Sequence, residues 1–197
     1  MTSKGGSEAI DFDQALYAAD GEVFYSIDLD DVTPGIYDYL RISLSYQNYT
    51  INFRAQDLDL TGTIASFVGS NTYIDSYTVN EQSVTVNENK LQGYWAFEAD
   101  FPGISIIEGQ APAGATTVPN PIHDFSPIPI GSCLVTGAFK TPFEITGNET
   151  SDVVITCSVS INNSFEWKDE NMNGIYEPSD GDQVVDMGVR GLIPMIE

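Results

Sequence analysis

Apolar and polar residues alternate along most of the chain, and this period of two predicts an all-β fold. Tyr49, Ile51 and Phe53, for example, alternate with the polar Asn52 and Arg54. Because successive side chains of a strand point to opposite faces of a sheet, each such segment has one buried and one solvated face. The pattern recurs in residues 23–29, 36–46, 49–53, 64–68, 73–79, 84–86, 91–101, 133–139, 143–146, 153–161 and 183–187. Turn residues separate these segments, so we expect an antiparallel β-sandwich of about 8–10 strands.

Two stretches lie outside this pattern. Proline cannot donate a ladder hydrogen bond, and residues 103–131 carry five prolines among small residues, namely Pro112, Pro119, Pro121, Pro127 and Pro129. We expect a long proline-rich loop there, either over one end of the sandwich or as a break between two subdomains. Residues 1–19 are polar and rich in small side chains, with a short helix over 7–19 at most. We expect an N-terminal tether over 1–19 and a single β-sandwich domain over 20–197.

The composition is that of a folded but strongly acidic protein. The 197 residues are 42% hydrophobic and carry a formal net charge of −22. This apolar content suffices for one sizeable core, and it argues against disorder despite the charge. With only seven Lys and Arg residues, the chain has no basic patch for the phosphates of nucleic acid or anionic lipid. No apolar run is long enough to form a transmembrane helix.

Residues 169–180 hold the sharpest chemical signal in the sequence. Calcium binds about six to eight hard oxygen ligands, and alternate residues of a tightly wound loop can direct their oxygens at one centre. Gly174 permits the turn that brings the chain back around the ion. An ordinary hydrophilic turn is the alternative, because Asn, Asp and Gly dominate turns for backbone reasons alone. We predict a Ca²⁺ site whose ligands, at positions 1, 3, 5, 7, 9 and 12 of the loop, are Asp169, Asn171, Asn173, Ile175 (through its backbone carbonyl), Glu177 and Asp180.

This spacing resembles the EF-hand-type loop, and more closely its variants in dockerin-like and other extracellular calcium modules. The resemblance covers residues 169–180 only. It departs from the EF-hand pattern at position 12, where Asp180 replaces the bidentate Glu, and Asp182 and Asp186 are further candidate ligands. The flanks also differ, since a strand-like segment precedes the loop and Pro178 would interrupt a helix. The resemblance therefore implies a structural calcium clamp rather than a sensor.

The chain as a whole resembles bacterial cell-surface lipoproteins of unassigned function, whose mature domains follow a polar linker. The features that carry this resemblance are the polar N-terminal stretch, the acidity and the strands rich in Thr, Ser and Asn. It implies an extracellular or cell-envelope location. The sequence contains no lipid-bearing cysteine that would support the resemblance further.

The two cysteines and the single histidine of the sequence do not indicate a catalytic site. Cys133 and Cys157 alternate with apolar residues, which places both on core faces. We expect free thiols, and a disulfide is the alternative if their strands adjoin. His123 is the sole histidine, and it lies in the proline-rich segment beside Asp124. A catalytic His needs an oriented partner and a nucleophile, and no nucleophile motif is visible, so we expect a solvated His123.

Paired carboxylates and aromatic residues are the remaining candidates for a site. Glycosidase chemistry needs two carboxyl groups across a cleft at a defined separation, which spacing along one strand cannot establish. We therefore expect the acidic pairs Asp28/Asp30, Asp57/Asp59 and Glu98/Asp100 to be solvated. Aromatic faces can stack on sugars, but aromatic residues of a β-sandwich are more often core. The aromatic residues open to both interpretations are Tyr37, Tyr39, Tyr46, Tyr49, Tyr73, Tyr77, Tyr94, Trp95 and Trp167.

These observations favour a non-enzymatic function. Our leading hypothesis is a calcium-stabilised β-sandwich of the bacterial cell envelope or exterior that serves adhesion or ligand binding. The alternative is a carbohydrate-binding or accessory domain of a polysaccharide-processing system. A hydrolase with scattered carboxylates is a third hypothesis.

Overall fold

The computed structural model describes residues 16–69, 74, 76–86, 90–102, 105–114, 118, 120–129 and 131–197. This part of the chain is all-β, as the alternation predicts, and its paired strands run antiparallel. Two short 3-10 helices, η2 (Leu29–Asp31) and η3 (Pro178–Asp180), interrupt it. Its strands are β1 (Gly35–Ser43), β2 (Tyr46–Ala55), β3 (Leu58–Phe67), β4 (Ser76–Thr78), β5 (Ser83–Thr85), β6 (Tyr94–Glu98), β7 (Ile107–Gln110), β8 (Leu134–Ile145), β9 (Ile155–Ser160), β10 (Phe165–Lys168), β11 (Gln183–Met187) and β12 (Gly191–Ile196).

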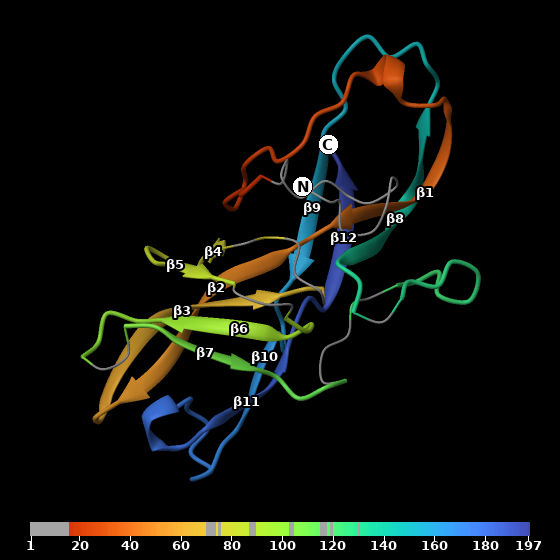
Figure 1. The fold of residues 1–197 in the computed structure, drawn as a ribbon. Helices are drawn as coiled ribbons and strands as arrows, with labels where there is room; N and C mark the ends of the chain where they lie inside the picture. Colours follow the sequence, from red (N-terminus) through yellow and green to blue (C-terminus); the bar gives the residue numbers. More distant parts are fainter. Residues whose placement is uncertain are drawn as a thin grey trace.

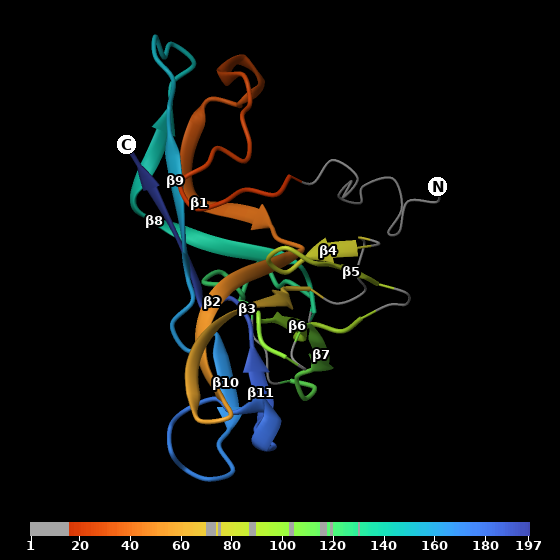
Figure 2. The ribbon, with the colours of Figure 1, turned by 90° about the vertical axis from the view of Figure 1, so that its left-hand side faces the viewer.

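A four-stranded sheet in the order β2-β3-β6-β7 is the largest unit among the described residues. The other strands form the antiparallel pairs β1-β8, β9-β12, β10-β11 and β4-β5. Figures 1 and 2 show β1, β8, β9 and β12 together in one half of the molecule, and the four-stranded sheet with β10 and β11 in the other. The all-β prediction is confirmed, whereas the arrangement of these sheets as a sandwich stays a prediction.

Both faces of the four-stranded sheet are buried. On one face, Phe53, Ile64 and Phe97 pack against Tyr176 and Met187 from the β10-β11 hairpin and its loop. On the other face, a second cluster joins the same sheet to the β4-β5 hairpin, and it includes Ala65, Phe67, Tyr77, Val84 and Ala96. Neighbouring residues of β3 and β6 thus point to opposite cores, as the pleat requires.

A third cluster occupies the other half of the molecule. It contains Val68, Val135, Val189 and Leu192. Gly137 of β8 lies directly against β12, where an added Cβ would sit 2.4 Å from the carbonyl oxygen of Leu192. A side chain at this position would force the two strands apart.

The predicted strand over residues 23–29 is wrong. The segment contains no strand, and its last residue belongs to η2. Its alternating apolar side chains Val23, Tyr25 and Ile27 are exposed instead of buried. Periodicity predicts a conformation, but a strand also needs a neighbouring edge to bond. Residues 16–19 also have no regular structure, and residues 1–15 of the predicted tether lie outside the described part of the chain.

Other differences concern boundaries and weakly patterned strands. The predicted segment 36–46 divides between β1 and β2, while 133–139 and 143–146 belong to the single strand β8. Within the predicted proline-rich loop, β7 adds an edge strand to the four-stranded sheet. The sequence did not predict strand β12, because Pro194 interrupts its alternating pattern. In the structure β12 pairs with β9, and Pro194 lies opposite Cys157. Residues 103–104, 115–117, 119 and 130 of the proline-rich segment and residues 70–73 and 75 lie outside the described chain.

Both cysteines are free and half-buried. The Sγ of Cys133 lies 3.1 Å from the Oγ of Ser43. Cys157 packs against the third cluster, and burial raises the pKa of its thiol.

Candidate metal centre

The predicted calcium loop, residues 169–180, lies within the connection between β10 and β11, which spans residues 169–182. The last ladder pair before the loop is Lys168 with Gln183. Met172, Gly174 and Gly181 have positive φ angles of 60°, 76° and 102°, which glycine adopts readily. The turn signal at Gly174 therefore corresponds to a real left-handed position.

Asp169, at the start of the loop, folds the next residues around its carboxylate. Its Oδ2 accepts a hydrogen bond from the Gly174 N–H at 2.6 Å, and its Oδ1 accepts one from the Asn173 N–H at 3.2 Å. Bonds from backbone N–H groups, that of Gly174 above all, lower the pKa of this carboxyl. They favour its ionised form, which is the form that binds metal.

The polar side chains of the loop converge on Glu177. The Nδ2 groups of Asn171 and Asn173 donate to the same Glu177 Oε2, at 2.6 and 2.7 Å. Glu177 is only 6% exposed, and its carboxylate has two neutral amides as its hydrogen-bond partners in the described structure. Three of the predicted ligands are therefore within hydrogen-bond distance of one another. Ile175 is half-buried, and its N–H donates to Asn173 Oδ1 at 2.7 Å.

Asp182, at the end of the loop, accepts hydrogen bonds from two backbone N–H groups of the loop. Its Oδ2 accepts the Glu177 N–H at 2.8 Å, and its Oδ1 accepts the Glu170 N–H at 3.0 Å. Asp180, the predicted position-12 ligand, lies two residues earlier in η3 and is exposed. Asp186, the other further candidate, forms an ion pair with Arg190 at 2.7 Å.

Tyr176 anchors the loop to the core of the protein. Its side chain is 2% exposed, and its ring contacts those of Phe97, Phe165 and Trp167 at centroid distances of 6.1, 4.9 and 5.8 Å. Burial raises the pKa of its hydroxyl. The Arg54 N–H of β2 donates to the Tyr176 carbonyl at 2.8 Å. Tyr176 thus couples the loop to the four-stranded sheet.

The donor set of the loop suits a hard cation. Carboxylate, amide and carbonyl oxygens are the ligands that calcium takes, and Asp169, Asn171, Asn173 and Glu177 supply such atoms from one compact turn. No group of three or more His, Cys, Asp or Glu side chains that could hold a metal occurs in the described residues. The predicted set includes the three carboxylates of Asp169, Glu177 and Asp180, which therefore do not form such a group in the described structure.

Two of the other candidate residues, Glu98 and Asp59, make structural contacts. Glu98 is 8% exposed, and its carboxylate accepts the N–H groups of Asn80, Glu81 and Gln82 at 2.9–3.2 Å, so it is not solvated as predicted. Asp59 pairs with Arg54 at 2.7 Å. His123 lies in a turn of the proline-rich segment.

Three of the aromatic candidates are buried, Tyr39 is exposed, and the other described ones, Tyr37, Tyr46, Tyr49 and Trp167, are half-buried. Tyr94 and Trp95 belong to the buried cores, and Tyr77 does as well. Trp167 is half-buried and stacks on Phe165 at a centroid distance of 5.4 Å. Because their faces are covered by protein, Tyr94 and Trp95 cannot form a sugar-stacking platform.

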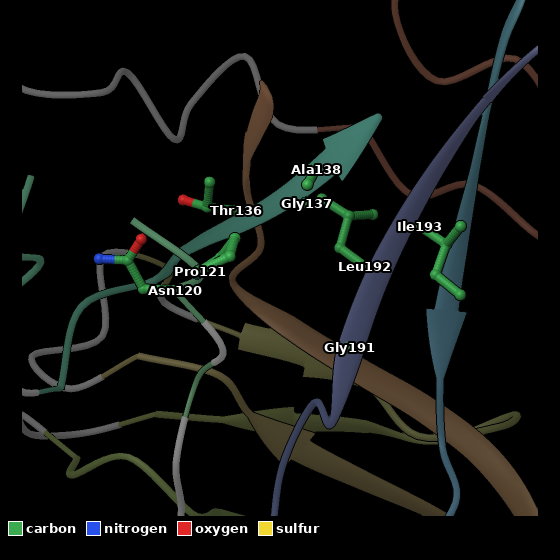
Figure 3. Close-up of a pocket in the computed structure, with 8 residues that line it drawn as sticks. All are labelled: Asn120, Pro121, Thr136, Gly137, Ala138, Gly191, Leu192 and Ile193. Carbon is green, nitrogen blue, oxygen red and sulfur yellow. The ribbon is translucent and has the colours of Figure 1, made fainter. Parts of the chain in front are cut away.

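An open groove of about 450 Å³ lies between β8 and β12, and Figure 3 labels the residues that line it. Gly137 and Leu192 come from the two strands, and Asn120 and Pro121 come from the proline-rich segment. The Thr136 hydroxyl in the groove already accepts a hydrogen bond from Arg41 Nε at 3.0 Å. None of the eight residues labelled in Figure 3 is titratable, so these side chains offer no acid or base.

No protein-family model matches the chain, and comparisons with curated proteins and with solved structures find no match. Within the described residues, no helix has the length and apolar character needed to span a membrane.

Proposed function

We propose that this protein is a non-enzymatic, calcium-stabilised all-β domain of the cell envelope or exterior that serves adhesion or ligand binding. The observation that carries the calcium proposal is the convergence of Asn171 and Asn173 on the buried Glu177 carboxylate. Burial of a carboxylate is costly without a partner of opposite charge, and the side chain has two neutral amides as hydrogen-bond partners. The nearby Arg54 guanidinium interacts with Glu177 electrostatically but donates its hydrogen bond to Asp59, so a divalent cation in this loop would add positive charge directly at the carboxylate.

The residues that would hold the ion are Asp169, Asn171, Asn173, Glu177, Asp180 and the carbonyl of Ile175. When bound, calcium supplies positive charge to a protein with a net charge of −22 and thereby reduces its self-repulsion. Asp182 is a positioning residue in this proposal, because it fixes the backbone at both Glu170 and Glu177.

A calcium ion in this loop would act on the fold through Tyr176. The loop closes the β10-β11 hairpin, and the hairpin covers one face of the four-stranded sheet. Ordering the loop therefore stabilises the attachment of the hairpin to the sheet. Extracellular loops of this kind bind calcium at roughly 10⁻⁴–10⁻³ M, which suits a constantly calcium-rich medium and a structural role.

The external location and the binding role rest on composition and on the resemblances of the sequence. The acidic surface with few basic residues disfavours nucleic acid and anionic lipid as partners. Glu98 and Asp59 are held by structural contacts, so the acidic pairs to which they belong do not support the hydrolase hypothesis.

The test is thermal unfolding in about 10 mM CaCl₂, in MgCl₂ and in EDTA at matched ionic strength. With the affinities above, saturation at about 10 to 100 times the dissociation constant adds roughly 1.4–2.7 kcal/mol, or roughly 3–10 °C in Tm for a domain of this size. Asp169→Asn and Glu177→Gln should abolish the calcium-dependent shift, whereas the exposed Asp38→Asn should retain it. A Tm that does not respond to calcium would refute the metal site.

A further inference from the structure

Residues 23–28 form an exposed segment that belongs to no sheet within the described part of the chain. Val23, Tyr25 and Ile27 are 84%, 70% and 51% exposed, and they recur at the period of two that places side chains on one face of a strand. Asp28 has the extended backbone angles φ −65° and ψ 134°. Three neighbouring large apolar side chains open to solvent are the type of surface that marks an interaction site.

The backbone of this segment is also unpaired. Within the described chain, the N–H and C=O groups of Val23 to Ile27 make no hydrogen bond with another residue. Turns hold both ends in place, since the Glu22 N–H bonds to the Ala19 carbonyl and the Asp31 N–H bonds to the Asp28 carbonyl. The segment is therefore anchored at both ends, and its backbone groups are free to pair along its length.

The charge around the segment is of one sign. Between residues 16 and 40 the sequence contains no Lys, Arg or His. The acidic residues of this stretch are Asp20, Glu22, Asp28, Asp30, Asp31 and Asp38, and all of them are exposed. The apolar face is thus bordered by carboxylates, which attract a basic surface and repel an acidic one.

We propose that residues 23–28 add as a strand to the exposed sheet edge of a basic protein partner. Strand addition satisfies the free backbone groups through a ladder, and the alternate side chains enter pockets of the partner. A second copy of this chain is disfavoured as the partner, because each copy carries a charge of −22. The proposal rests on the ligand-binding role given above and is independent of the calcium loop.

The probe is a synthetic peptide of alternating lysine and valine residues, added to the full chain while amide hydrogen exchange is followed by NMR. We expect saturable protection of the amides of Val23 to Ile27. Tyr25→Pro removes a backbone donor at an exposed position and should abolish this protection. Asp20→Lys with Asp28→Lys should weaken binding about tenfold. The pair Asp100→Lys with Glu166→Lys, two exposed residues in the other half of the molecule, changes the net charge equally and should leave binding nearly unchanged.

Three results would overturn the proposal. The first is an absence of protection at saturating peptide, and the second is an equal loss of binding for the two charge-reversed pairs, which indicates non-specific attraction. The third is protection of Val23 to Ile27 without peptide. Protection that rises with protein concentration would identify a second copy as the occupant, and protection independent of concentration would identify the chain itself. The calcium-dependent Tm is measured on the same protein. A Tm that still responds to calcium, without peptide binding, would refute only the proposed strand addition and not the metal site.

Discussion

Two buried carboxylates of this acidic protein bind backbone N–H groups rather than basic side chains. Glu98 of β6 accepts N–H groups from residues 80–82, between β4 and β5, and Asp182 accepts those of Glu170 and Glu177. With few Lys and Arg in the sequence, backbone donors perform the role that ion pairs perform elsewhere. Hydrogen bonds to a charged group contribute about 1.5–3 kcal/mol each, so these two side chains fix the conformation of their loops.

Asp182→Asn should destabilise the metal-free protein, whereas Asp180→Asn should not. Asparagine at 182 retains one acceptor oxygen and loses one charge-assisted bond, so we expect a loss of about 1.5–3 kcal/mol. Asp180 is exposed, and its substitution should stay within about 0.5 kcal/mol. Urea unfolding in EDTA measures both variants. Equal free energies of unfolding would show that Asp182 does not fasten the loop.

Asp169 makes the stability of the loop dependent on pH in the acid range. Its folded-state pKa is lowered by the Gly174 N–H above all, below the ordinary value of about 3.9. The ionised carboxylate therefore stabilises the fold at pH values above the ordinary pKa. This contribution is lost as the pH falls through the lowered folded-state pKa. The difference in stability between the wild type and Asp169→Asn, measured in EDTA, should shrink as the pH is lowered from 6 toward 2. A difference that is constant over this range would contradict the assignment.

At the scale of elements, two hairpins cover the two faces of one sheet. Hairpin β4-β5 covers the face that presents Phe67 and Ala96, and hairpin β10-β11 covers the face that presents Phe53 and Phe97. Figure 1 shows the β10-β11 hairpin below the sheet, with the candidate metal loop at its far end. The loop thus lies where it can affect the attachment of a whole element.

Removal of calcium should loosen the β10-β11 hairpin before the rest of the protein. If the ion holds residues 169–182, a chelator frees the turn and weakens the packing of Tyr176. Limited proteolysis with and without EDTA should then show new early cleavage within residues 169–182. Identical cleavage patterns under the two conditions would count against the proposed clamp.

Gly137→Ala should separate β8 from β12, and Gly35→Ala provides its control. The added Cβ at Gly137 would lie 2.4 Å from the Leu192 carbonyl oxygen and 2.8 Å from Pro194 Cδ. Overpacking of this kind costs typically about 1–3 kcal/mol. No atom lies within 4 Å of an added Cβ at Gly35, so that variant should match the wild type. The free energy of unfolding in urea distinguishes the two variants, and equal values would refute the close contact.

At the scale of the whole molecule, self-repulsion is the dominant electrostatic effect. A net charge of −22 on 197 residues opposes the compact state at low ionic strength. The ion pairs Arg54–Asp59 and Lys168–Glu170 include strongly exposed partners, and such pairs contribute only about 0–1 kcal/mol. Screening by salt should therefore weaken the repulsion among carboxylates by more than it weakens the attraction within the ion pairs.

The Tm of the metal-free protein should rise with NaCl concentration. Raising the salt from about 0.01 M to about 1 M shortens the Debye length from about 30 Å to about 3 Å, which screens the carboxylates from one another. Calorimetry in EDTA measures this rise without any contribution from calcium. A Tm that falls with salt would mean that attractive pairs outweigh the repulsion.

Several structural features could be predicted because they depend on neighbouring residues. The alternation of Tyr49, Ile51 and Phe53 identifies β2 and its buried face, and the glycine at 174 identifies a left-handed turn. The role of Asp182 could not be predicted in the same way. Its two partners are twelve and five residues away, and their N–H groups meet it only after the hairpin has formed.

The sequence by itself determined the all-β class, the acidic surface and the run of oxygen-bearing side chains in residues 169–180, because these follow from local periodicity and composition. Only the tertiary structure decided which segments pair. It left residues 23–28 unpaired within the described chain, while β12 formed despite Pro194. It also brought Asn171 and Asn173 onto a buried Glu177. The physical reason is that pairing and burial depend on partners distant in the chain, whose positions no local pattern contains.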